Sequence, residues 1–150
     1  MEKDAKKIRL TIGIDPGKNG GIAGVVSENV VLFSYPSPKK RVDGKYIEDV
    51  ARMVSILKDC ASLKPVVCIE AVHAFPGQGV SSMFSFGKNF GLWIGICSSL
   101  DYPINFVTPQ KWKKSFGLIG KEKKDSIKFV QQKFPKLKLT DGIADAILIA

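Results

Sequence analysis

The sequence predicts an α/β fold in which helices cover a mixed sheet. The chain has 150 residues, 45% of them apolar, which is enough for one core and one domain. Strand patterns follow one another near the N-terminus, whereas strands and helices alternate later, and this order favours antiparallel and then parallel pairing. We expect residues 8–150 to form a single domain around a five-stranded sheet, with three antiparallel strands followed by two parallel ones, after a charged tail at residues 1–7.

The first three predicted strands form an antiparallel meander. Residues 8–14 alternate with period two and place four apolar side chains on one face, those of Ile8, Leu10, Ile12 and Ile14. Asn19-Gly20 is typical of a type I′ hairpin turn, whose two central residues both need positive φ. Residues 21–26 and 30–35 then read as the second and third strands.

The middle of the chain predicts two helices separated by a strand. Residues 46–58 have the apolar spacing of an amphipathic helix, and residues 66–70 are a short apolar run typical of a buried central strand. Residues 81–99 read as a long apolar helix. Every fourth residue on one side of this helix is glycine (Gly87, Gly91 and Gly95), which indicates close backbone packing on a sheet or on a partner helix.

The last third predicts one more strand and three helices. Residues 104–107 form the strand, and Thr108-Pro109 is a good N-cap and first-turn pair for a helix through Trp112. Apolar spacing predicts the next helix up to Phe134, where Pro135 ends it. Residues 141–150 are helical in character.

The charge of the chain favours a polyanionic partner. The formal net charge is +9, and residues 108–138 hold ten lysines against two acids. A lysine run is often only a solvated helix face, but so uneven a distribution favours an electrostatic binding surface for nucleic acid. No apolar run approaches the roughly 18 residues that cross a bilayer, so we expect no membrane partner.

The number and spacing of the cysteines and the single histidine exclude several kinds of site. Three cysteines without paired spacing support neither a disulfide framework nor a zinc site, and a single histidine excludes a histidine-rich metal cluster. The start of the chain lacks the apolar segment of a secretory signal. We therefore expect a cytoplasmic protein, with a nucleoid, a viral replication site or an organelle left open, whose chemistry depends on carboxylates.

Four carboxylates stand at positions that suggest one site. Asp15 and Glu70 end two strands that we expect to be parallel neighbours, and Asp141 and Asp145 share a face of the last helix. Such a set suits two hard cations about 4 Å apart, Mg²⁺ or Mn²⁺ rather than zinc. The alternatives are a plain turn at Asp15-Pro16-Gly17 and an N-cap role for Asp141.

These segments resemble the RuvC-type Holliday junction resolvases. Residues 13–21 are similar to the first motif of that family, residues 67–72 to the second, residues 81–95 to the helix that follows, and residues 141–150 to the terminal acidic motif. Residues 76–84 and 107–114 look closest to the phage and plastid branch. The match runs from about Ile8 to Ala150, with its motifs in order.

The resemblance implies an RNase H-like fold, a homodimer and paired symmetric nicks in a four-way DNA junction. Carried over by motif, the metal-binding catalytic residues are Asp15, Glu70, Asp141 and Asp145, with two Mg²⁺ ions per active site, Mn²⁺ as a substitute, and no small-molecule cofactor. One departure concerns the last two acids. They are four positions apart here and three apart in bacterial RuvC, so the resemblance assigns Asp145 more directly than Asp141.

The same resemblance predicts contacts with branched DNA. The phosphate-binding candidates are Lys111, Lys113, Lys114, Lys121, Lys123 and Lys124. Phe75 is a candidate wedge between bases, or else an ordinary loop anchor. The competing functions are an RNase H-like nuclease for RNA–DNA hybrids or flaps, a relative of actin-like sugar kinases, and a basic DNA-binding protein without catalysis.

Overall fold

Helices flank a five-stranded mixed sheet in the structure, which is a computed structural model that describes residues 9–27 and 30–150. The order across the sheet is β3-β2-β1-β6-β7. Its strands are β1 (Leu10–Asp15), β2 (Gly21–Val26), β3 (Val31–Pro36), β6 (Val66–Glu70) and β7 (Ile104–Val107). The first three pair antiparallel, and β6 and β7 run parallel to β1, which confirms the predicted sheet. The expected tail at residues 1–7 lies outside the described residues.

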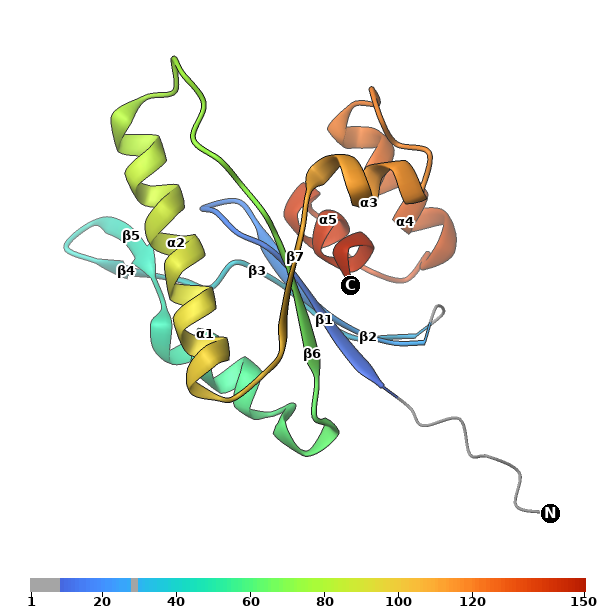
Figure 1. Cartoon of the computed structure of the whole chain (residues 1–150), viewed down its shortest axis with the longest axis horizontal. Coiled ribbons are helices and arrows are strands. Elements are labelled where there is room, and N and C mark those ends of the chain that lie inside the picture. Colours follow the sequence, from blue (N-terminus) through green and yellow to red (C-terminus); the bar gives the residue numbers. More distant parts are fainter. Residues whose placement is uncertain (1–8, 28–29) are drawn as a thin grey trace.

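Successive side chains of β1 point to opposite faces of the sheet, and a separate hydrophobic core covers each face. Leu10, Ile12 and Ile14 are buried on one face, as predicted, together with residues of α1 (Val50–Lys58) and α2 (Val80–Ser99). Ile8, the fourth residue of the predicted apolar face, lies outside the described residues. The other face lies against α5 (Asp141–Ile149), with α3 (Pro109–Ser115) and α4 (Lys123–Lys133) outside it (Figure 1). A short 3₁₀ turn, η1 (Ala61–Leu63), leads into β6. None of the helices within the described ranges is long and apolar enough to span a membrane.

The predicted hairpin between β1 and β2 is present, but its turn is of another kind. Asp15 pairs with Gly21, so the loop contains residues 16–20 rather than a two-residue turn. Asn19 and Gly20 do not have the positive φ expected of them. Instead Gly17 has φ of 126°, and its carbonyl accepts a hydrogen bond from the amide of Gly20.

A second hairpin stands where the sequence predicted the start of a helix. β4 (Lys39–Val42) pairs with β5 (Lys45–Glu48) in a separate two-stranded sheet. Asp43 and Gly44 have φ of 47° and 76°, the positive values that a type I′ turn needs. The prediction of a helix over residues 46–58 was therefore wrong in its first turn, because α1 begins only after Asp49, whose carboxylate accepts from the amide of Arg52.

The glycine side of α2 does not pack on the sheet. Gly87, Gly91 and Gly95 are exposed, and a Cβ atom at any of them would meet nothing within 4 Å. Of the two expectations for this stripe, packing on the sheet is wrong, and packing on a partner helix stays a prediction.

Close backbone contact brings α5 onto the sheet. A Cβ atom at Gly13 would clash with the carbonyl of Ala146, and one at Gly142 would clash with the backbone of Asn19 and Gly20. Only glycine allows the helix to lie so close to β1 and to the loop that follows it. The two glycines therefore place the acidic end of α5 beside the end of β1.

Candidate active site

Asp15 and Glu70 end neighbouring parallel strands and point to the same face of the sheet. Ile14 of β1 pairs with Ile69 of β6, so the next residue of each strand is a carboxylate. Ile14 and Ile69 are buried on the α1–α2 side. Because side chains alternate along a strand, Asp15 and Glu70 face the α5 side. The expected convergence of these two strand ends is confirmed by the register.

The acids of α5 lie at the same end of the sheet. Thr140 is the N-cap of this helix, and its side chain accepts from the amide of Ile143, so the alternative N-cap role for Asp141 was wrong. An open hollow of about 610 Å³ is lined by Asp15, Asp141 and Asp145. Its other walls are the loop after β1, Lys123, and α2 residues that include Ser81 and Phe86.

Burial and repulsion from neighbouring carboxylates raise the pKa values of Asp15 and Asp145. The pKa of Asp15 is raised from 3.8 to about 8, first by burial and then by the charges of Glu70 and Asp145, against the opposing charges of Lys123 and Lys113. The pKa of Asp145 is raised to about 6 by burial and by Glu70. Burial also raises the pKa of Glu70. Carboxylates from three elements therefore act on one another electrostatically, and a bound cation would relieve their repulsion.

The donor set has the chemistry of a site for hard cations. Four carboxylates offer the oxygen ligands that Mg²⁺ and Mn²⁺ prefer. Within residues 9–27 and 30–150, no group of three acidic, histidine or cysteine side chains is already gathered closely enough to hold a metal ion. The residue types and their repulsion fit a divalent cation, and the carboxylates would have to move closer together to bind one.

Trp112 is a site residue that the sequence reasoning missed. Its indole Nε1–H donates to Oε2 of Glu70 over 2.7 Å, and its side chain is only 3% exposed. Thr108 caps α3 by accepting from the amide of Lys111, which starts the helix directly after β7. The hydrogen bond from Trp112 lowers the pKa of Glu70 against the effect of burial, because it favours the charged carboxylate.

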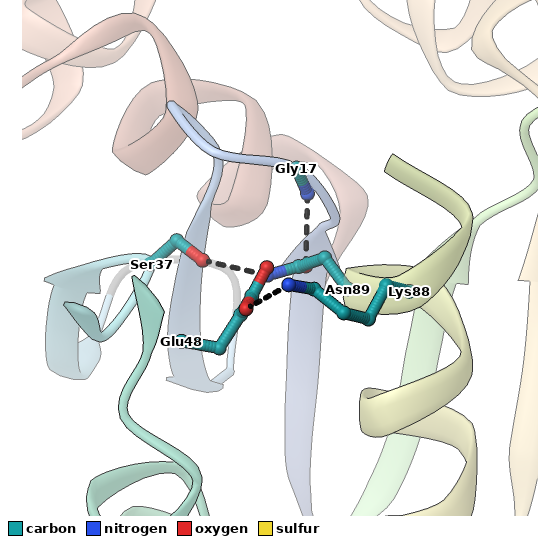
Figure 2. A network of polar contacts seen from close by, with 5 residues as sticks. All are labelled: Gly17, Ser37, Glu48, Lys88 and Asn89. Carbon is teal, nitrogen blue, oxygen red and sulfur yellow. Dashed lines mark hydrogen bonds and ion pairs between the residues drawn. The ribbon is translucent and has the colours of Figure 1, made fainter. Parts of the chain in front are cut away.

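A buried amide fixes the loop that follows Asp15. Asn89 is 2% exposed, and its Oδ1 accepts from the amide of Gly17 over 2.9 Å while its Nδ2 donates to Oγ of Ser37 over 3.4 Å. Beside it, Lys88 and Glu48 form an ion pair of 2.8 Å. Figure 2 shows these contacts joining α2, the loop after β1 and the β4–β5 hairpin. The sequence analysis missed Asn89. The signal that could have found it is a polar residue within an otherwise apolar helix.

The structure brings only two of the six candidate lysines to the acids. Lys123 lines the hollow, and the charges of Lys123 and Lys113 both act on Asp15. Lys124 instead pairs with Glu122 over 2.6 Å at the surface. The remaining candidates, Lys111, Lys114 and Lys121, are exposed around α3 and α4. Phe75 is 60% exposed in the loop between β6 and α2.

Comparisons with known proteins find similarities both in sequence and in fold. The Holliday junction resolvase MOC1 of the Chlamydomonas reinhardtii chloroplast is 26% identical over 110 residues, which cover 67% of this chain and only 12% of that relative. The structure of Thermus thermophilus RuvC with a Holliday junction substrate has a TM-score of 0.67 and 16% identity, with 95% of this chain and 90% of that one covered. The chain has the fold of RuvC. No protein-family model matches the sequence.

A second Thermus thermophilus RuvC structure matches with a TM-score of 0.60 over 94% of this chain. The RNase H-like fold class and the resemblance to RuvC-type resolvases are thus confirmed. The MOC1 match is a match in sequence and the RuvC matches are matches in fold, so the two kinds of comparison support the resemblance independently.

Proposed function

We propose that this chain is a metal-dependent endonuclease that resolves four-way DNA junctions by paired symmetric nicks. The observation that carries the proposal is the convergence of Asp15, Glu70 and Asp145 from β1, β6 and α5. Asp15 and Glu70 end paired strands, and the charges of Glu70 and Asp145 raise the pKa of Asp15. Its support is the RuvC fold and the similarity to a chloroplast junction resolvase, both reported above.

The four acids are the proposed ligands of two Mg²⁺ ions, with Mn²⁺ as a substitute. When bound, such ions activate water and stabilise the leaving oxygen of a phosphodiester. The chain's own contribution is positioning. Trp112 orients the carboxylate of Glu70, Asn89 fixes the loop after Asp15, and Lys113 and Lys123 place positive charge where a phosphate enters the hollow.

The proposed DNA surface extends from the hollow over α3 and α4. Exposed lysines of this region give affinity for phosphates without reading sequence. Phe75, exposed in the loop directly after Glu70, is proposed to stack on a base at the branch point. Both proposals keep DNA on the side of the molecule where the acids lie.

We propose that the active form is a homodimer built on α2. The outer side of this helix carries Val80 and Phe84, 85% and 73% exposed, and continues into the stripe of Gly87, Gly91 and Gly95. A second copy packed there supplies a second acidic site related by a two-fold axis, which suits a nearly two-fold symmetric junction. Gly91→Leu is expected to shift the sedimentation coefficient from dimer to monomer. An unchanged coefficient would contradict this interface.

The function is tested with three labelled substrates: a synthetic four-way junction, a simple fork and an RNA–DNA hybrid, each with Mg²⁺. We expect symmetric nicks in the junction and little cutting of the others. Asp15→Asn should bind the junction and leave it intact, because the substitution keeps the size of the side chain and removes its charge. Preferential cutting of the fork or hybrid would assign another nuclease activity, and no cutting at all would leave a DNA-binding protein.

A further inference from the structure

The β4–β5 hairpin carries a cationic face that the proposed function has not used. Arg41 lies directly opposite Tyr46, and Lys39 opposite Glu48, in the register of the two strands. Because alternate residues share a face, Lys39, Arg41 and Tyr46 lie on the same side of the hairpin as Glu48. All three are exposed, and Tyr46 has 65% of its surface free.

This face borders an open hollow of about 450 Å³ between the hairpin, β3 and α1. Lys39 and Tyr46 line it from the hairpin, and Tyr35 and Arg52 line it from β3 and α1. The guanidinium of Arg52 lies 5.2 Å from the ring centroid of Tyr35, which fixes a cation beside an aromatic hydroxyl. We call Lys39, Arg41, Tyr46, Tyr35 and Arg52 the hairpin surface.

The segment that carries most of the hairpin surface has a positive net charge, because residues 39–52 hold five lysines and arginines against three acids. No acidic residue lines its hollow. Of these acids, Asp43 lies in the exposed turn of the hairpin, Glu48 pairs with Lys88 over 2.8 Å, and the carboxylate of Asp49 accepts from the amide of Arg52 as a helix cap. Three cations with two tyrosines are the side chains that DNA-binding proteins direct at backbone phosphates.

The hairpin surface starts close to the acidic hollow and lies on the side of the hollow opposite α3 and α4. The amide of Ser37, two residues before β4, donates to the carbonyl of Gly20 over 2.9 Å, and Gly20 lines the acidic hollow. In Figure 1 the hairpin lies beyond α2, on the side away from α3 and α4. The chain thus has cationic surfaces on both sides of one acidic site.

We propose that the hairpin surface binds the phosphodiester backbone of a duplex DNA arm other than the arm held by the lysines of α3 and α4. The inference rests on the proposed function, because only a branched substrate presents two duplex arms around one cleavage point. Contact with two arms at once raises affinity for a junction far more than affinity for a linear duplex. The hairpin surface thereby favours branched DNA.

The experiment measures binding without divalent metal, so that DNA stays uncut. The variant Lys39→Gln/Arg41→Gln is compared with a matched control, Lys58→Gln/Lys64→Gln, which also removes two exposed cations, at and after the end of α1. Each variant is titrated with a four-way junction and with a linear duplex of one arm's sequence, over a series of salt concentrations. Thermal unfolding confirms that both variants fold.

We expect the hairpin variant to lose about tenfold in junction affinity, with a salt slope reduced by about two, and to lose at most about twofold for the linear duplex. The control should change neither. Equal losses in both variants, or no loss in the hairpin variant, would overturn the inference while leaving the proposed function intact. A hairpin variant that becomes monomeric would overturn it too, by assigning the surface to contact between copies. If the unmutated protein binds no junction, the proposed function fails as well.

Discussion

The indole of Trp112 holds the carboxylate of Glu70 through a hydrogen bond of 2.7 Å that joins α3 to the end of β6. The residues are 42 positions apart in the chain and meet because β7, which leads into α3, pairs in parallel with β6. A carboxylate held by a buried donor keeps one orientation, which matters where it has to share a cation with other acids.

Replacing Trp112 with phenylalanine should lower cleavage about tenfold or more, since partners that orient a metal ligand typically contribute 10–100-fold. Mn²⁺ affinity measured by calorimetry should fall in parallel, while junction binding without metal stays unchanged. Trp93→Phe is the matched control, because Trp93 is also buried but its Nε1 has no hydrogen-bond partner in the described part of the chain. Equal loss in both variants would mean that only packing was disturbed.

Asn89→Leu should destabilise the fold and loosen the loop after Asp15. The substitution keeps the volume but leaves the amide of Gly17 without its acceptor, which costs about 1–3 kcal/mol of the free energy of unfolding. Urea denaturation measures the loss, and cleavage should fall at temperatures where the variant is still folded. Gln132→Leu, at an exposed amide of α4, is the control and should change neither quantity. A variant as stable as the unmutated protein would contradict the role of Asn89.

The metal-free protein should become less stable as the pH rises from about 4 to 8. The pKa of Asp15 is raised from 3.8 to about 8, so over this range the folded state binds more protons than the unfolded state, and the free energy of unfolding falls with increasing pH. Asp145, with its pKa near 6, adds to the fall below that pH. Melting temperatures measured in a chelator test this.

At pH 8 Asp15→Asn should raise the melting temperature of the metal-free protein by at least about 2–4 °C, which corresponds to roughly 1 kcal/mol for a chain of this size. Saturating Mg²⁺ should stabilise the unmutated protein and not the variant. A variant that melts lower than the unmutated protein at pH 8 would show that the carboxylate of Asp15 is not under repulsion.

The variants Lys123→Gln and Lys124→Gln should differ in cleavage rate, because the two neighbouring lysines of α4 have different surroundings. Lys123 lines the acidic hollow, so its loss should reduce the cleavage rate at least about tenfold by removing positive charge beside the scissile phosphate. Lys124 pairs with Glu122 at the surface, and its loss should change the rate less than about threefold. Single-turnover rates at saturating junction provide the comparison. A larger effect at Lys124 would reverse the assignment.

Local sequence patterns predicted the parts of the site that depend on local chemistry. Alternation along β1 and the apolar run of β6 placed Asp15 and Glu70 at strand ends, and the parallel pairing confirmed that they are neighbours. The spacing of Asp141 and Asp145 placed both on α5. The second hairpin also had a local signal, Asp43-Gly44, which the helical spacing of the following residues obscured.

Trp112 and Asn89 could not be predicted in the same way. Their partners are 42 and 72 positions away, and no local pattern tells which distant carboxylate or amide a buried polar side chain meets. The distinction between Lys123 and Lys124 likewise depends on which side of α4 faces the acids, and that became clear only once α4 and α5 were packed together.

The anomalous scattering of Mn²⁺ in crystals of this protein soaked with the ion is the most direct measurement of the central claim. The account predicts two ions ligated by Asp15, Glu70, Asp141 and Asp145, and none at that place in Asp15→Asn crystals. Scattering peaks elsewhere on the molecule, or the same peaks in the variant, would contradict it.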